Sequence, residues 1–526
     1  MKFLKSDVFI FLLFMLIWYS LFRYAGTFTQ GYNIYEDNLI ITTCEDIDST
    51  SLYDGFINLV KNDINGRARF RPVFSLHLAV TVFMFRTNLT SHTVYMVLLG
   101  VLTLYLFYKF AFNIGFNKWQ SVIFSLLTLA GSSAIVWGQL LDAENIGMFM
   151  LSLTLYFMSK SIVSDKYKTT FTYTFILFLF LAALCKESFA LTIPAVIFLY
   201  IWQKSNVNKT TVIQSAKTSL TVIIIPLLYV MLLFLFITVT IGVNNQNYAG
   251  VDFKLLVNNF FPFFFKEGIL NILFCLSAAG ILILMAASFK KDLITKIHKK
   301  QIYYLCIWWL LLVVPQLALY AKTGMEERYY LPFMLGFSFM SVFVLKQIFS
   351  EKNIPEVIKY SYLLLVFAYI LFQYGFRTIP TLATFADECR ATSNLLNSIS
   401  EKNDDETLLL VMDPVQNFHE AYSLKTYMDH EGSHKNYMYE FLRSSYIHPF
   451  FASFYSDSVA YKEYIDGVVG QLGAGNITDP EHRYDFSEVL ILGNLEKDFL
   501  EKNYKGFNAS SYIKQVYGRF VLYKKK

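Results

Sequence analysis

A polar stretch near the start of the chain carries the residues best suited to chemistry. It covers 31–72 and contains two neighbouring acids and three arginines: Glu36, Asp37, Arg67, Arg69 and Arg71. A carboxylate can take a proton from a hydroxyl group, and an arginine fork can hold two oxygens of a phosphate. Loops between membrane helices are usually short, so about forty polar residues between apolar segments need a function. We expect this stretch to form the edge of an active site in a membrane enzyme.

Composition places the chain in the membrane. Of its 526 residues 55% are hydrophobic and only 16% are charged, and the mean hydropathy is +0.42. Soluble proteins carry about 25% charged residues. The chain is therefore an integral membrane protein with membrane lipids as partners, and its net charge of +5 gives no reason to expect a nucleic-acid partner.

Apolar runs of spanning length recur along the first 379 residues. After a first run within 1–24, they cover 92–112, 118–138, 145–162, 168–185, 188–203, 218–241, 267–288, 301–321, 328–346 and 359–378. The run at 72–86 reaches only about 22 Å against an apolar core of about 30 Å. We expect it to form an amphipathic helix at the membrane surface that does not cross.

Lysine positions decide the sidedness. If 72–86 does not cross, then Lys2, Lys5 and the lysine-rich loops share one side: 164–168, 203–217, 289–300 and 346–359. Cationic loops favour the cytoplasm. The pattern predicts about eleven spans with a cytoplasmic N-terminus, an uncleaved first span and a first outer loop over 25–91.

The same topology gathers the remaining charges near helix ends on the outer side. They lie in the segments 140–145, 185–188 and 322–328 together with the first loop: Asp142, Glu144, Lys186, Glu187 and Arg328, followed by Tyr329 and Tyr330. A charge at a helix centre costs about 2.5–3.5 kcal/mol, so these residues are expected at a polar surface site.

Beyond the last apolar run the composition is that of a soluble domain. We expect residues 380–526 to form an extracytoplasmic α/β domain that ends in a β-hairpin turned at Tyr517–Gly518. Residues 1–379 would form the transmembrane catalytic domain.

The order of these motifs resembles a known class. Glu36-Asp37, the Arg69-to-Pro72 entry into a helix, the acidic 142–144 segment, Lys186-Glu187 and the run from Glu327 to Pro332 look like the GT-C class of polytopic glycosyltransferases. Within it the chain is similar to the protein O-mannosyltransferases and the lipid A aminoarabinose transferases. Where many relatives have His-Pro-Pro, this chain has Phe70-Arg71-Pro72. The resemblance implies a GT-C fold over residues 1 to about 346.

The resemblance also implies the substrates and the roles. The donor would be a sugar on polyprenyl phosphate, and a hydroxyl of a glycan, lipid or protein would be the acceptor. Asp37 would be the base, with Glu36 beside it, and direct attack would invert the anomeric centre. The cations that would hold the donor phosphate are Arg71, Lys186, Arg328, Arg69 and Arg67. The residues that would bind other parts of the substrates are Asp142, Glu144, Glu187, Tyr329 and Tyr330.

Other interpretations remain open at this point. The acids could cap helices, the arginines could anchor the chain at headgroups, and Lys186-Glu187 could be a structural ion pair. Glu36, Asp37, Asp142 and Glu144 could bind Mg²⁺ or Mn²⁺ if they met, although the resemblance assigns no metal. The alternative functions are a lipid-linked polysaccharide polymerase or ligase and a membrane transporter without enzymatic activity. The expected location is a bacterial cytoplasmic membrane.

Overall fold

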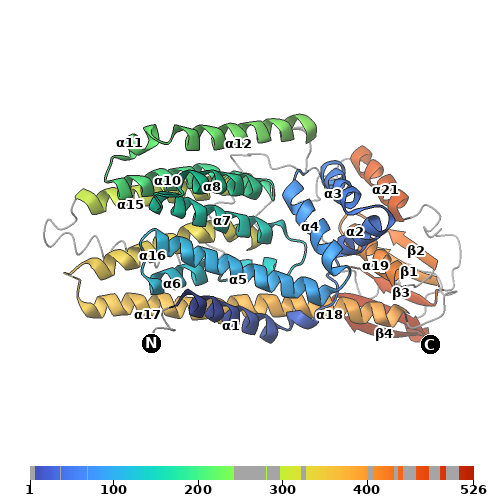
Figure 1. Ribbon diagram of the computed structural model, residues 1–526. Coiled ribbons are helices and arrows are strands. Elements are labelled where there is room, and N and C mark those ends of the chain that lie inside the picture. Colours follow the sequence, from blue (N-terminus) through green and yellow to red (C-terminus); the bar gives the residue numbers. More distant parts are fainter. Residues whose placement is uncertain are drawn as a thin grey trace. The chain divides into compact units, whose positions relative to one another are not determined.

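The computed structural model divides the chain into two compact units (Figure 1). It describes residues 6–35, 37–67, 69–241, 280, 296–320, 327–352, 354–400, 407–431, 436–441, 458–472, 486–492 and 509–526. The first unit consists of Met1–Thr27, Leu52–Thr81 and Ser91–Ala383. The second unit consists of Phe28–Ser51, Val82–Thr90 and Thr384–Lys526, so it includes two stretches of the predicted first loop.

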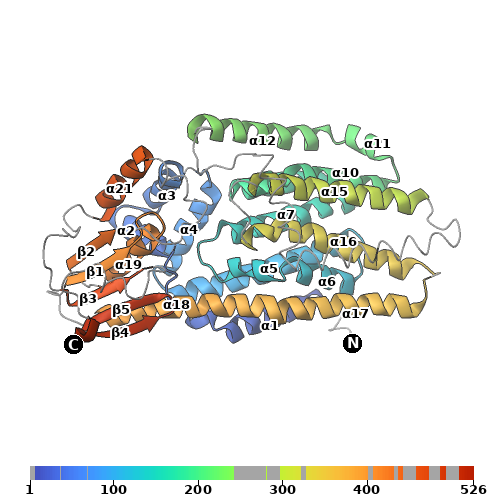
Figure 2. The same cartoon turned by 180° about the vertical axis from the view of Figure 1, so that it is seen from behind.

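The first unit is built from apolar helices, of which α7, α8, α10, α15 and α16 run side by side in both opposite views (Figures 1 and 2). Its helices are α1 (Asp7–Ala25), α3 (Leu52–Arg67), α6 (Lys118–Thr128), α7 (Ala143–Val163), α8 (Lys168–Ala183), α9 (Glu187–Ala190), α10 (Ile193–Asn208), α11 (Val212–Lys217), α12 (Leu220–Ile241), α15 (Lys296–Tyr320), α16 (Leu331–Ser350) and α17 (Glu356–Gln373). Helices α4 (Pro72–Phe85), α5 (Leu89–Asn113) and α18 (Ile379–Ser400) have residues in both units.

Seven helices of the described ranges are long and apolar enough to cross a membrane, judged by length and composition. Helices α4 and α8 are shorter apolar helices, and 267–288 lies outside the described residues apart from Gly280. The total of about eleven spans therefore stays a prediction.

The run 118–138, predicted as one span, is not a continuous helix. Helix α6 ends at Thr128, and the chain continues as the 3-10 helix η3 (Ser132–Trp137). Between them Gly131 has a φ of 97°, a left-handed conformation that glycine adopts without steric penalty. Thr378 fixes this break, because its Oγ1 accepts a hydrogen bond of 2.9 Å from the amide of Gly131.

Local sequence explains where other helices begin and end. Ser6 caps α1 by accepting a hydrogen bond of 3.1 Å from the amide of Phe9, and Gly26 ends that helix with a φ of 77°. Asn117 and Gln120 form a reciprocal capping box at the start of α6.

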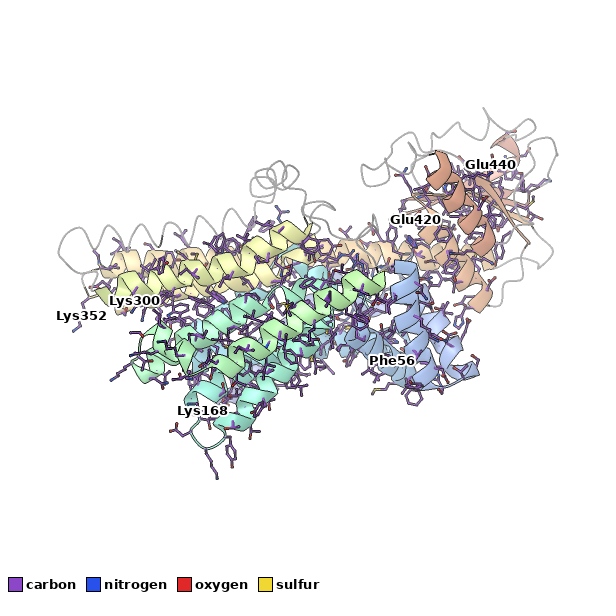
Figure 3. All side chains as sticks on the ribbon, turned by 90° about the horizontal axis from the view of Figure 1, so that it is seen from above. Phe56, Lys168, Lys300, Lys352, Glu420 and Glu440 are labelled. Carbon is purple, nitrogen blue, oxygen red and sulfur yellow. The ribbon has the colours of Figure 1, made fainter. Side chains whose placement is uncertain are left out.

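The first unit has two distinct ends. Figure 3 shows Lys168, Lys300 and Lys352 at one end of the helices and Phe56 at the other. We call the first the lysine end. Since α7 and α16 each run toward the lysine end, their first residues, next to Glu144 and Arg328, lie at the opposite end about 30 Å away. Helix α8 returns from the lysine end, so Lys186, which follows it, also lies at the opposite end.

The second unit contains a five-stranded sheet with the order β2-β1-β3-β5-β4. Its strands are β1 (Thr407–Met412), β2 (Asn436–Phe441), β3 (Glu488–Ile491), β4 (Tyr512–Tyr517) and β5 (Phe520–Lys525). Strands β1, β2 and β3 are parallel, and β4 and β5 form an antiparallel hairpin around Gly518 and Arg519. This hairpin confirms the predicted turn at Tyr517–Gly518.

Both faces of β1 are buried. Leu408, Leu410 and Met412 belong to one apolar cluster, and Leu409 and Val411 to another. This period of two is that of a parallel strand covered on both sides. The larger cluster includes residues of α18 and of α19 (Phe418–His430), together with Ile41 of α2 (Asn38–Ser49). Helix α21 (Ser458–Leu472) contributes Val468 and Leu472.

Candidate active site

Lys186 and Glu144 form an ion pair at the end of the first unit opposite the lysine end. Lys186 lies in the break between α8 and α9, and Glu144 lies in the first turn of α7. Both side chains are buried. The break predicted from the Lys186-Glu187 sequence is present, and it brings the lysine to a carboxylate 42 positions earlier in the chain.

Arg328 and Asp142 form a second ion pair. The distance from Arg328 NH1 to Asp142 Oδ1 is 3.0 Å, with Asp142 buried and the arginine side chain 26% exposed. Asp142 stands at the N-cap of α7, but its side chain makes no capping hydrogen bond. Asp142 therefore occupies the helix-cap position that was one of the open interpretations, but its carboxylate pairs with a cation and not with the backbone of α7.

The ring of Tyr329 joins the two pairs. Lys186 Nζ lies 4.4 Å from its centroid, and Arg328 Cζ lies 5.2 Å from it. The two cationic groups are thus at most about 10 Å apart, since each lies about 5 Å from one centroid. Tyr320, at the end of α15, stacks on the ring of Tyr329 with a centroid distance of 4.1 Å and an interplanar angle of 5°. Sequence reasoning missed Tyr320, which no local motif distinguishes from the 36 tyrosines of the chain.

Arg69 adds a third cation to this group. Its amide donates a hydrogen bond of 2.8 Å to the carbonyl of Asp63, which fixes the backbone before α4. Burial lowers the pKa of Arg69, but nearby acids, first Glu187 and then Glu144, raise it, and the net pKa lies above its ordinary value. Arg69 is therefore charged and lies in the field of the same acids. We call the six charged residues the charged cluster: Arg69, Asp142, Glu144, Lys186, Glu187 and Arg328.

Close backbone packing makes this convergence sterically feasible. A Cβ added to Gly147 of α7 would lie 2.2 Å from Cε2 of Phe189 in α9, so only glycine allows the two helices to approach this closely. Gln316 of α15 donates a hydrogen bond of 2.5 Å from Nε2 to the carbonyl of Ser188. These contacts place Lys186 and Glu187 against α7 and α15.

Arg71 lies next to this region in a different pairing. Its Nε and NH2 donate hydrogen bonds of 3.1 and 2.7 Å to the two carboxylate oxygens of Asp63, and both side chains are buried. The amide of Val73 binds the carbonyl of Leu184, so the start of α4 lies against the end of α8. Sequence reasoning missed Asp63, because nothing in α3 marks one of its acids as a partner. The phosphate role of Arg71 stays a prediction.

Asp37 belongs to the second unit. It is buried, and its Oδ2 accepts a hydrogen bond of 2.8 Å from the amide of Asn33. Burial, with Glu431 and Asp37, raises the pKa of Tyr32 to about 12, and burial followed by Asp37 raises the pKa of Tyr427 well above its ordinary value. The carboxylate therefore lies close to two tyrosines. That it meets the charged cluster stays a prediction.

Three predicted residues lie outside what can be placed. Glu36 is outside the described residues, and the side chains of Arg67 and Tyr330 are outside the described part of their helices. Within the described ranges no group of three or more metal-binding side chains occurs. The carboxylates of Asp142 and Glu144 are instead neutralised by Arg328 and Lys186.

Chemically, the charged cluster is a neutral set of three acids and three cations. Four of its members form buried or partly buried ion pairs, and Tyr329 packs against two of the cations. Ion pairs of this kind hold cations in a fixed geometry before an anion arrives. The arrangement can bind an anionic group at one end of an apolar helical unit.

No family model matches the chain, and the comparison with curated proteins gives no match. Solved structures that are similar to it include two of one protein. ArnT from Cupriavidus metallidurans in the apo state has a TM-score of 0.47 at 12% identity and covers 97% of both chains. ArnT from the same organism bound to undecaprenyl phosphate has a TM-score of 0.45 at 10% identity, again with 97% of both chains covered. Because both TM-scores are below 0.5 and both identities are low, the roles of the residues rest on the geometry of this chain alone.

Proposed function

We propose that the protein is a glycosyltransferase that moves a sugar from polyprenyl phosphate to an acceptor hydroxyl on the outer side of the membrane. The observation that supports this most is the convergence of Arg69, Lys186 and Arg328 at one end of an apolar helical unit. A lipid phosphate has an apolar tail for the bilayer and a charged head at its surface. Cations gathered where apolar helices end suit both parts of such a ligand.

In this proposal the cations hold the phosphate of the donor. Arg328 is the most suitable, because its side chain is 26% exposed and its fork can hold two oxygens. Lys186 and Arg69 add positive charge, and Asp142 and Glu144 orient these cations in the resting enzyme. When the phosphate binds, it competes with the two carboxylates for Arg328 and Lys186. Arg71 and Arg67 are further candidates for the same role.

The transfer step needs a base but no strong acid. The acceptor hydroxyl gives its proton to Asp37, with Glu36 orienting the acceptor, and its oxygen forms a bond to the anomeric carbon. The bond between that carbon and the phosphate oxygen breaks, and the lipid phosphate leaves with the electron pair. Cations stabilise this leaving group, and one displacement inverts the anomeric centre.

The distribution of lysines supports an orientation. Lys168, Lys300 and Lys352 share one end of the first unit, and the charged cluster lies at the other. By the positive-inside rule the lysine end faces the cytoplasm. We therefore place the charged cluster and the C-terminal α/β domain outside a bacterial cytoplasmic membrane.

The test is consumption of the donor. Purified protein is incubated with radiolabelled polyprenyl-phosphate hexoses and an envelope fraction that supplies acceptors, and free polyprenyl phosphate and labelled product are measured. A glycosyltransferase releases both in equal amounts. An intact donor in every combination would contradict the proposal, and movement of an intact donor across proteoliposomes would indicate a transporter.

A further inference from the structure

Part of the predicted first loop packs against the C-terminal part of the chain within the second unit. A Cβ added to Gly31 would lie 1.6 Å from the Oγ of Ser393, so the backbone at Gly31 lies directly on α18. Ile34 and Ile41 belong to the same apolar cluster as Leu408 of the sheet. The stretch around Asp37 is therefore built into the core of this unit.

Tyr427 of α19 contacts this stretch in two ways. Its ring stacks on Tyr32 with a centroid distance of 4.6 Å and an interplanar angle of 21°. Its hydroxyl donates a hydrogen bond of 2.5 Å to the carbonyl of Asn33. The amide of Asn33 in turn donates the 2.8 Å hydrogen bond to Asp37. Tyr427 thus fixes the backbone that holds the carboxylate of Asp37.

Arg519 provides a second attachment from the turn of the β4–β5 hairpin. Its guanidinium carbon lies 4.4 Å from the ring centroid of Tyr35, and its NH1 donates a hydrogen bond to the hydroxyl of that tyrosine. On its other side NH2 pairs with Glu420 at 3.1 Å. Glu420 is buried and also accepts a hydrogen bond of 2.8 Å from Asn417, so it holds the guanidinium in place. Figure 3 labels Glu420 within this unit.

We propose that Tyr427 and Arg519 are positioning residues for Asp37, and that the C-terminal part of the chain thereby orients the catalytic base. This rests on the proposed function, in which Asp37 takes the proton of the acceptor. Tyr427 fixes the backbone of Asn33, four positions before Asp37. Arg519 fixes the side chain of Tyr35, two positions before it. A displaced base lowers the rate of a step without changing how the donor binds.

The first test separates turnover from donor binding. Tyr427→Phe removes only the hydroxyl and keeps the ring on Tyr32, so kcat should fall about tenfold with an unchanged KM for the donor. The matched control is Tyr437→Phe, which removes a buried hydroxyl that donates to Asp429 at 3.2 Å in the same unit. It should keep kcat within about twofold. Equal kcat in the two variants would overturn the proposal.

Arg519 is tested with its conservative variant. Arg519→Ala should lower kcat, and Arg519→Lys should restore part of it, because a lysine can still pair with Glu420 although it lacks the planar fork. The melting temperature is measured beside kcat: Arg519→Lys should stay within about 3 °C of the wild type, whereas Arg519→Ala should melt lower because buried Glu420 loses its cation. If Arg519→Ala raised the donor KM and left kcat unchanged, Arg519 would not position the base.

A second measurement does not depend on activity. Amide hydrogen exchange over 31–41 should be about tenfold faster in Tyr427→Phe than in the wild type and unchanged in Tyr437→Phe. Identical exchange in all three proteins would overturn the positioning role. If the wild type consumed no donor, the proposed function would fail, whereas the exchange data would still decide whether Tyr427 orders this stretch.

Discussion

Lys186 Nζ and Glu144 Oε1 form a buried ion pair between two segments that approach each other because Gly147 has no side chain. Burying two charges requires excellent geometry, and removing one partner leaves the other uncompensated. The pair therefore stabilises the site only as a unit. Tyr329 packs against Lys186 and further restricts where its ammonium group can lie.

Variants of this pair should separate its effect on stability from its effect on donor turnover. Lys186→Met is expected to lower the free energy of unfolding by about 3–5 kcal/mol, because Glu144 loses its partner. Adding Glu144→Gln should restore most of this loss, since no unpaired charge remains. Donor turnover by the double variant should stay at least about tenfold below the wild type. A double variant as active as the wild type would show that Lys186 only stabilises the fold.

Arg328 should matter for the donor more than for the acceptor. Arg328→Ala is expected to raise the KM for the polyprenyl-phosphate sugar about tenfold or more, because a charge-assisted pair of hydrogen bonds to phosphate is lost. Arg328→Lys keeps the charge without the fork, so its KM for the donor should lie between those of the wild type and Arg328→Ala. Steady-state kinetics with each substrate varied in turn measure the effect. An equal increase in both KM values would count against a phosphate contact.

Gly147 should not tolerate a larger residue. In Gly147→Ala the new Cβ overlaps the ring of Phe189, so the unfolding free energy should fall by about 1–3 kcal/mol and donor turnover should drop. Adding Phe189→Leu to Gly147→Ala should restore part of the lost unfolding free energy and part of the lost donor turnover. The control is Gly467→Ala in α21, where nothing lies within 4 Å of the new atom and a small gain in stability is expected. Equal effects of the two alanines would refute the steric argument.

Cysteine labelling in intact cells should report the orientation. In a background whose five native cysteines are replaced by serine, Lys352→Cys should be shielded from an impermeant thiol reagent. Tyr53→Cys should react, because Tyr53 is 69% exposed and lies in α3, whose Phe56 is at the end opposite the lysine end in Figure 3. The reverse pattern would place the lysine end outside and would remove the charged cluster from the outer surface.

Several elements of the site could be predicted from local sequence. The segments of Asp142, Lys186 and Arg328 carry charges between apolar runs, and a charge avoids the centre of a helix in a membrane. That rule alone indicates that such residues lie at helix ends. Together with the count of spans it also indicates which of them share one end, and the structure brings these three segments together.

Contacts between distant segments could not be predicted in the same way. The pairing of Arg71 with Asp63, and the stacking of Tyr320 on Tyr329, depend on how α3 and α15 pack and leave no periodic signal. The break after α6 was missed although the run 118–138 contains Gly131-Ser132-Ser133, a stretch typical of turns, because the apolar residues on both sides of it suggested one span. Nor does composition reveal that Tyr427 binds Asn33, nearly 400 positions earlier.

The central claim is that Asp37 is the base while the cations of the first unit bind the donor. The direct measurement is sugar transfer by Asp37→Asn, together with equilibrium binding of polyprenyl phosphate. The asparagine can still accept the hydrogen bond from Asn33, so the fold should be kept. We predict wild-type affinity for polyprenyl phosphate, an unchanged melting temperature and no detectable transfer. Transfer at the wild-type rate by this variant would contradict the account.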